Sequence, residues 1–335
     1  MSKVLTEMVS DKWFNRLMAE GRIGEAREYL SESGHSTADF DNLFASTVNR
    51  TLLQGYNYVP NNHTLLCQVD DQVKDFREMT DIRTTEFDDL DAVPEMGEYK
   101  ATTMDEEAVT WAVAKYGKTF GVSWEMMRND DLRGFRDITL KLGRAAGRTE
   151  RGRITRYFSG DVQIYDGNNL FHAGTHGNAA TTALAIASVE TGILAMANQT
   201  DTKGNLLNIS PKYLVTGPAL QLTAQKIVTS EFAFSAAQAN TGEPNVVRNR
   251  VQPVVLEGIT SATAWFLVAD PAQFAALKLG FLKGLRNPQT FRQATQVEGG
   301  TPDDGSWQND GINFKVRHVT GSTCVDYRPL YRGNV

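Results

Sequence analysis

The sequence predicts an α+β fold, and three observations lead to this prediction. Residues 98–125 are rich in Val, Thr, Trp, Tyr and Phe, which suit strands, because branched and aromatic side chains pack well on a pleated surface. Residues 131–158 instead repeat apolar residues at three- and four-residue steps, the period of a helix. Elsewhere helical and strand patterns are mixed without a regular βαβ alternation, which favours α+β over α/β.

Residues 1–56 contain apolar residues at helical spacing, interrupted by glycines, and this pattern predicts amphipathic helices. Residues 57–97 contain many scattered aspartates, and we interpret them as an irregular acidic segment. Residues 98–125 follow and predict a long two-stranded hairpin.

The helix predicted at 131–158 would be roughly 42 Å long, which exceeds the width of a small domain. Four glycines lie inside it, and each weakens a helix by about 1 kcal/mol relative to alanine. Packing must therefore hold this helix. Gly143 and Gly147 share one face, which permits the close approach of another backbone. Its apolar face is predicted from Leu132, Phe135, Ile138, Leu142, Ala145 and Ala146, and after a polar gap from Ile154, Tyr157 and Phe158.

The remaining elements follow from shorter patterns. Residues 161–178 are rich in turn formers, and residues 183–198 have helical spacing. A short buried strand is expected after Pro211, then a helix with Pro218 in its first turn. Further predicted elements are strands around Pro253 and at 262–271, a helix near 271–279, and a closing hairpin that turns at Gly321-Ser322.

Composition excludes several classes of function. The formal charge is −6, without a basic tail, which disfavours tight nucleic-acid binding over a broad surface. Cys67 and Cys324 form neither a disulfide framework nor a zinc pattern, so we expect reduced, intracellular folding. No apolar run approaches the ~20 residues of a membrane-spanning helix, and the N-terminus lacks the core of a signal peptide. We expect no cofactor and no membrane partner.

His172 and His176 are the best candidates for a metal site, because residues four apart share one face of a helix. The residues between them are Ala-Gly-Thr in a turn-rich segment, and no Glu follows as in H-E-x-x-H. We therefore expect turn histidines that form local hydrogen bonds. A metal-dependent hydrolase that uses this pair is kept as an alternative from a different class.

Arginines gather on the long helix, where Arg144, Arg148, Arg151, Arg153 and Arg156 recur at helical spacing. Such a cluster can meet phosphates or the carboxylates of a neighbouring protein. Glu150 within it and the acidic segment upstream favour protein contacts, and a plain solvated helix face is the alternative.

The order of these segments resembles the major capsid proteins of tailed bacteriophages, in particular the Mu-like group with the Hong Kong 97-type fold. The resemblance is carried by YGKTFGVSWEMMRNDD, the long helix, DGNNLFHAGTHGN, LLNISPKYLVTGPALQLTAQKI and the final DGINFKVRHVTGSTCVDYRPLYRG. It covers the chain from about Asp81 to the end and is weaker over the first sixty residues.

The resemblance implies a division of the chain into functional parts. These begin with an N-terminal arm at 1–60 and an extended hairpin loop at 81–125, which would lie across an adjacent subunit. A peripheral domain would comprise residues 61–80, 126–180 and 268–335, with its spine helix at 131–158. Residues 181–267 would form an axial domain. The expected function is structural and not enzymatic: a capsid subunit that self-assembles into the icosahedral shell enclosing double-stranded DNA.

The resemblance also implies partners and contact residues. Other copies in hexamers and pentamers are the main partners, with a scaffold, a portal and decoration proteins. Because only a short arm precedes the hairpin, we expect a separate scaffold or assembly without cleavage. The shell would be assembled in the host cytoplasm and found in the virion. Candidate inter-subunit contacts are Trp13, Trp111, Lys115, Tyr116, Lys118, Phe120, Arg144, Arg148 and Arg151. A bacterial cargo compartment with the same fold is the alternative within the structural class.

Overall fold

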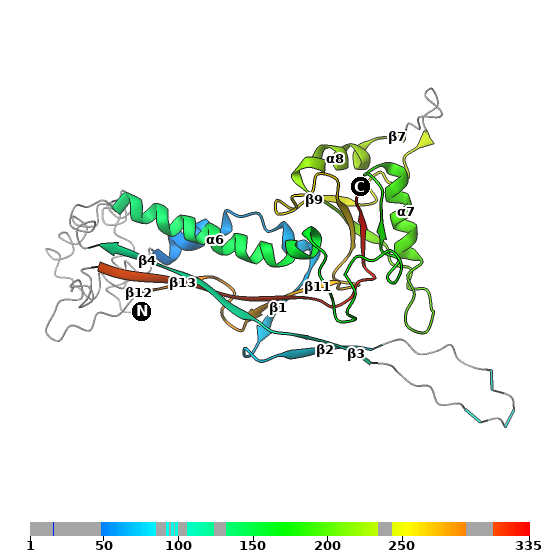
Figure 1. The fold of residues 1–335 in the computed structure, drawn as a ribbon, viewed down its shortest axis with the longest axis horizontal. Coiled ribbons are helices and arrows are strands. Elements are labelled where there is room, and N and C mark those ends of the chain that lie inside the picture. Colours follow the sequence, from blue (N-terminus) through cyan, green and yellow to red (C-terminus); the bar gives the residue numbers. More distant parts are fainter. Residues whose placement is uncertain are drawn as a thin grey trace. The chain divides into compact units, whose positions relative to one another are not determined.

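The structure, a computed structural model, divides the chain into two compact units. It describes Arg16, a few residues between 92 and 99, and the ranges 48–84, 106–123, 132–233, 243–292 and 311–335. Unit 1 comprises residues 1–60, 115–150 and 284–320, and unit 2 comprises residues 61–114, 151–283 and 321–335. Helix α6 (Leu132–Ser159) and strand β13 (Gly311–Cys324) contribute residues to both units (Figure 1). Among the described residues, no helix is long and apolar enough to cross a lipid bilayer.

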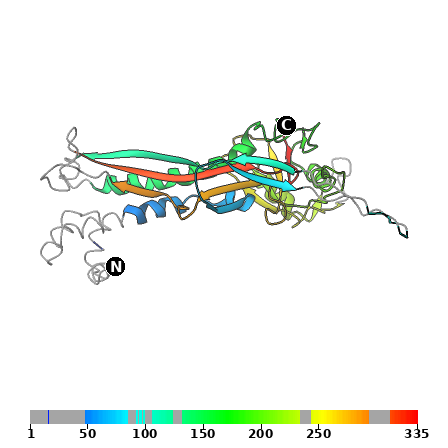
Figure 2. The ribbon, with the colours of Figure 1, turned by 90° about the horizontal axis from the view of Figure 1, so that it is seen from below.

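Strand β13 is the centre of the sheet in unit 1. It pairs with β4 (Ala114–Ser123) and, antiparallel, with β12 (Gln289–Arg292). Figure 2 shows β4 lying along β13. Glycines permit this approach, because a Cβ at Gly117 would lie 2.5 Å from the carbonyl oxygen of Val316.

Helix α6 confirms the prediction for residues 131–158, including the role of its glycines. In unit 1 its partner is a helical segment at residues 48–57. A Cβ on Gly143 would overlap the carbonyl oxygen of Leu52, so only glycine fits there. The predicted apolar face is slightly rotated. Ile138, Leu142 and Ala145 are half-buried, whereas the buried face consists of Thr139, Gly143, Ala146, Gly147 and Glu150. Apart from Glu150, its residues are small, because the neighbouring backbone is so close.

In unit 2, β1 (Gln68–Val73) follows a 3₁₀ helix, η1 (Asn62–Leu66), and pairs parallel with β11 (Leu277–Leu282). Two predictions are corrected here. Residues 57–97 are not simply irregular, because β1 and β2 (Met79–Thr84) lie within them. The helix expected near 271–279 is also wrong. Leu277, Leu279 and Phe281 are fully buried and alternate with Lys278 and Gly280, so the period is two and the segment is a strand.

The second sheet of unit 2 has the strand order β5-β14-β10-β6-β9. Its strands are β5 (Ala179–Ala180), β14 (Leu330–Gly333), β10 (Trp265–Ala269), β6 (Pro211–Thr216) and β9 (Gln252–Val255). The predicted helices are present as α7 (Ile186–Ala197) and as α8 (Gln221–Thr229), which η2 (Pro218–Leu220) precedes. A short pair, β7 (Phe232–Ala233) with β8 (Glu243–Pro244), follows α8.

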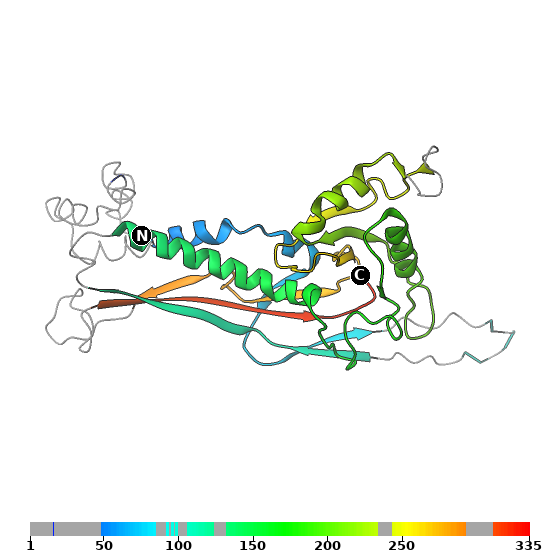
Figure 3. The same cartoon turned by 45° about the horizontal axis from the view of Figure 1, so that its top comes forward.

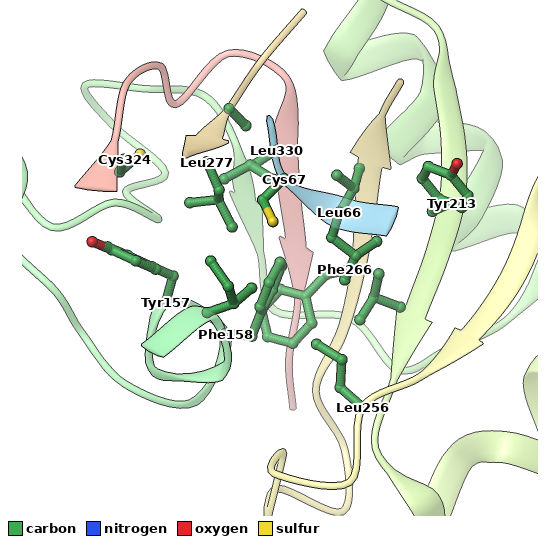
Figure 4. Close-up of a cluster of buried hydrophobic side chains, with 14 of the residues drawn as sticks. Leu66, Cys67, Tyr157, Phe158, Tyr213, Leu256, Phe266, Leu277, Cys324 and Leu330 are labelled. Atoms are coloured by element: carbon green, nitrogen blue, oxygen red, sulfur yellow. The ribbon is translucent and has the colours of Figure 1, made fainter. Parts of the chain in front are cut away.

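Two apolar cores lie on opposite faces of this sheet, because successive side chains of β10 alternate. Trp265 and Leu267 pack with α7 and α8, which Figure 3 shows beside the sheet. Phe266 and Val268 instead belong to the larger core (Figure 4). Figure 4 shows Phe266 beside Phe158, from the end of α6, and Leu66; the rings of Phe266 and Phe158 are 5.1 Å apart.

The closing hairpin predicted at Gly321-Ser322 is wrong, because β13 runs through both residues without turning. Gly321 has a different role. A Cβ there would lie 2.5 Å from the carbonyl oxygen of Ala112 and 2.9 Å from the Cα of Val113. The glycine therefore allows another chain segment to cross closely over the strand.

The hairpin predicted at 98–125 also has the wrong pairing. Strand β3 (Glu106–Trp111) pairs antiparallel with β2 (Met79–Thr84), which precedes it, while β4 pairs with β13. Between β3 and β4 the chain does not turn back; it crosses the sheet at residues 112–113. We call the β2–β3 pair the ribbon (Figure 1). Residues 85–91 and 100–105, which lie between its two strands in the sequence, are outside the described part of the chain.

Candidate assembly surface

The ribbon has two different faces. Its register places Met79 opposite Trp111 and Asp81 opposite Val109, so these side chains share one face. This inner face is mostly covered, with Trp111 and Val109 buried and Asp81 half-buried.

On the other face the register places the pairs Thr80–Thr110, Ile82–Ala108 and Thr84–Glu106. We call the part formed by Thr80, Ile82, Ala108 and Thr110 the outer face. All four residues are exposed, and Ile82 retains 60% of its accessible surface. These four residues are uncharged and open to solvent, and Thr and Ile suit strands.

The inner face is fixed to unit 2 where the ribbon begins. The indole of Trp111 lies directly on Gly280 of β11, where any Cβ would overlap the ring. Val113 is 3.5 Å from the same position, and Gly321 of the neighbouring β13 leaves room for Ala112. Two glycines on adjacent strands thus create a flat place over which residues 111–113 cross.

Charged groups complete this attachment. The indole N–H of Trp111 donates to Oδ2 of Asp81 at 2.7 Å. The ammonium of Lys278 lies 2.9 Å and 3.0 Å from the two oxygens of Asp81, 3.7 Å from a carboxylate oxygen of Asp70, and 5.5 Å from the Trp111 ring. We refer to all of these contacts of Trp111–Val113, Asp81, Lys278, Gly280 and Gly321 as the root contact.

The structure places the predicted contact residues in different environments. Trp111 is buried within unit 2, so its indole fixes the ribbon from inside the subunit. On β4, Lys115 and Lys118 are exposed, and Tyr116 is half-buried. Phe120 stacks on Phe314 at 5.2 Å.

The arginines of α6 also lie in different environments. Arg144 lies over the ring of Tyr58 at 4.3 Å, and Arg151 is hydrogen-bonded to Glu257. Arg148 is exposed. Trp13 lies outside the described residues. Inter-subunit contact by these residues stays a prediction.

Unit 1 contains a buried polar cluster that the sequence did not indicate. The Glu150 carboxylate of α6 accepts a hydrogen bond from the hydroxyl of Tyr56, and Nε2 of His318 lies 3.3 Å from it. Burial, the negative charge of Glu150 and this hydrogen bond raise the pKa of Tyr56 well above its usual range. The hydroxyl therefore stays protonated and donates to Glu150. The cluster joins α6, β13 and the helix at 48–57.

The histidine pair forms local hydrogen bonds, as the turn interpretation predicts. His172 accepts a hydrogen bond at Nδ1 from the amide of Thr175 at 2.9 Å. The ring nitrogens of the buried His176 lie 3.1 Å from the carbonyl oxygen of Leu170 and 2.6 Å from Oδ2 of Asp166. Within the described part of the chain, no three His, Cys, Asp or Glu side chains form a group that could hold a metal ion.

Comparison with known families decides what kind of protein carries this ribbon. The family described as phage capsid protein matches residues 106–333, more than half of the chain. The chain belongs to the phage capsid protein family. It is a structural capsid subunit that forms the viral shell. The comparison with curated proteins gives no match.

Solved phage structures share the capsid fold at low sequence identity. The structure from Microbacterium phage Oxtober96 has a TM-score of 0.54 and 8% identity, covering 82% of this chain and 90% of that chain. Mycobacterium phage Adephagia gives 0.51 and 11%, with coverage of 82% and 90%. The capsid structure of cyanophage P-SCSP1u gives 0.51 and 9%, with coverage of 80% and 86%. The predicted Hong Kong 97-type fold of the capsid subunit is thus confirmed.

Three residues of the capsid subunit that matter for its ribbon were missed from the sequence. Ile82 lies between charged neighbours in a segment that the residue pattern left irregular, although the resemblance placed it in the extended hairpin loop at 81–125. Lys278 was assigned to a helix, and Gly280 lies just past the predicted end of that helix. Their alternation with Leu277, Leu279 and Phe281 was the available signal.

Proposed function

We propose that the capsid subunit assembles by placing the outer face of its ribbon on a second copy of the chain, within the hexamers and pentamers of the shell. The observation that carries this proposal is the exposure of Ile82, 60%, on the outer face of the ribbon. A second copy is the natural occupant, because the family builds its shell from repeated subunits.

Physical arguments favour this surface. A two-stranded ribbon is only marginally stable in water on its own, so its second face gains from being covered. Each contact is modest, but closed symmetry repeats it many times over the shell.

Substitution at Ile82 tests the proposal. Ile82→Lys places a charge in the contact, whereas Ile82→Val keeps it apolar and serves as the control. We expect Ile82→Lys to give a folded subunit by circular dichroism that forms no closed shells in electron microscopy or light scattering. Shell formation by Ile82→Lys at the wild-type yield would refute the role of the outer face.

Other parts of the proposal concern the arm and the partners. The arm at 1–60 reaches over neighbouring subunits, the spine helix supports a peripheral domain, and the tips of the axial domain at 181–267 meet around the capsomer axis. The other partners in assembly are a scaffold, a portal and decoration proteins. The subunit belongs to the Mu-like group of these capsid proteins. The shell encloses double-stranded DNA without sequence-specific binding, in keeping with the formal charge of −6, and the subunit performs no catalysis.

A further inference from the structure

The root contact occupies the whole inner face where the ribbon begins. Trp111 contributes its ring to Gly280 and its N–H to Asp81, and Asp81 in turn receives the ammonium of Lys278. These residues come from β2, β3 and β11, so three strands are tied together at one point.

This arrangement restricts the ribbon in several directions at once. The indole cannot move toward β11, because it already lies on the Gly280 backbone. It cannot rotate without losing the 2.7 Å hydrogen bond to Asp81. Asp81 cannot separate from β11 without breaking a charge-assisted bond to Lys278, whose side chain is only 16% exposed.

The same residues decide which face of the ribbon points outward. Side chains alternate along a strand, so holding Asp81 against Lys278 directs the adjacent Ile82 away from the sheet. Trp111 and Thr110 are related in the same way on β3. Fixing the inner face therefore fixes the outer face.

We propose that the root contact is a positioning device that holds the ribbon in the direction required for contact with the next subunit, before that subunit arrives. Its positioning residues are Trp111, Asp81, Lys278 and Gly280. Pre-organisation lowers the ordering that each subunit must undergo on association, so it speeds assembly without adding any contact area. This inference rests on the proposed function of the outer face.

Two kinds of variant separate positioning from folding. Lys278→Met removes the ammonium and keeps most of the side-chain volume, while Lys278→Arg retains the ion pair with Asp81. Gly280→Ala displaces the indole. Its matched control is Gly152→Ala on the exposed side of α6, where an added Cβ has no neighbour within 4 Å.

The measurements are amide hydrogen exchange of β2 and β3 in unassembled subunits, and the rate of shell formation by light scattering. We expect Lys278→Met and Gly280→Ala to raise ribbon exchange at least tenfold and to slow assembly at least tenfold. The urea midpoint of Lys278→Met should stay close to that of the wild type. Lys278→Arg and Gly152→Ala should behave like the wild type in both measurements.

Two results would overturn the proposal: unchanged ribbon exchange in Lys278→Met, or faster exchange combined with wild-type assembly. Should Gly280→Ala fail to fold, Lys278→Met alone decides. The Ile82→Lys subunit distinguishes this inference from the proposed function. We expect Ile82→Lys to block assembly and to leave hydrogen exchange in the ribbon unchanged. Normal assembly by this variant would refute the proposed outer-face contact, but it would not affect the hydrogen-exchange test of the root contact.

Discussion

Replacement of Tyr56 by phenylalanine is the sharpest test of the buried polar cluster in unit 1. The change removes one hydroxyl and keeps the ring. Glu150 is only 2% exposed, so the lost donor cannot easily be replaced by solvent. His318, 3% exposed, still lies 3.3 Å from the carboxylate in the variant.

The expected magnitude follows from the chemistry of that hydrogen bond. A bond to a charged group contributes about 1.5–3 kcal/mol, and a buried acceptor that loses its donor incurs its desolvation penalty. We therefore expect Tyr56→Phe to lower the free energy of unfolding by about 2 kcal/mol.

Urea unfolding followed by circular dichroism measures this loss. Tyr58→Phe is the control, because Tyr58 is 71% exposed and its ring would still lie beneath Arg144. We expect the control to change stability by less than about 0.5 kcal/mol. Equal stabilities for Tyr56→Phe and Tyr58→Phe would refute the argument that the Glu150 carboxylate depends on Tyr56.

The pH dependence gives an independent check of the same hydroxyl. The folded pKa of Tyr56 is raised, so its contribution is present below the ordinary tyrosine pKa, about 10, and is lost as pH rises above it. The free energy of unfolding of the wild type should therefore exceed that of Tyr56→Phe by less in alkaline solution than at neutral pH. An advantage that grows with pH would contradict the raised pKa.

Two further predictions concern α6 and the turn at 161–178. Gly143→Ala should destabilise the subunit by more than about 2 kcal/mol, because the added Cβ overlaps the Leu52 backbone. Gly152→Ala should stabilise it by about 1 kcal/mol, because alanine favours a helix more than glycine does. The urea midpoints of the two variants measure these changes. Burial raises the pKa of Asp166, but hydrogen bonds from His176 and Asn168 outweigh burial and hold the pKa below its ordinary value. The wild type should therefore be more stable than Asp166→Asn above about pH 4, and this difference in stability should disappear at lower pH. Thermal melts between pH 2 and 7 measure it, and a constant difference would contradict this assignment.

The sequence patterns predicted elements whose own residues determine them. Helix α6 was found because its period and its glycines are local signals. Strands β1 and β2 were missed because their side chains are mostly polar, so neither shows a clear alternation. Such strands form because a neighbour offers an edge, and that information lies elsewhere in the chain.

The pairing of β3 and β4 illustrates the same limit at the candidate site. Both strands were predicted, but consecutive strands are often hairpin partners, and this prior decided the wrong pairing. The correct arrangement depends on Gly280 and Gly321, which make room for the crossing at residues 112–113. A glycine's neighbours across a sheet cannot be inferred from its own segment. The outer face was therefore not recognisable before the strands were paired.

The position of β14 has a consequence for the timing of folding during synthesis. This strand lies between β5 and β10, so residues 330–333 complete the interior of a sheet whose other strands are all translated earlier. Until then Trp265 lacks the backbone of Gly333, with which it pairs, and part of its ring stays uncovered. A nascent chain therefore cannot complete this sheet before residues 330–333 have been synthesised.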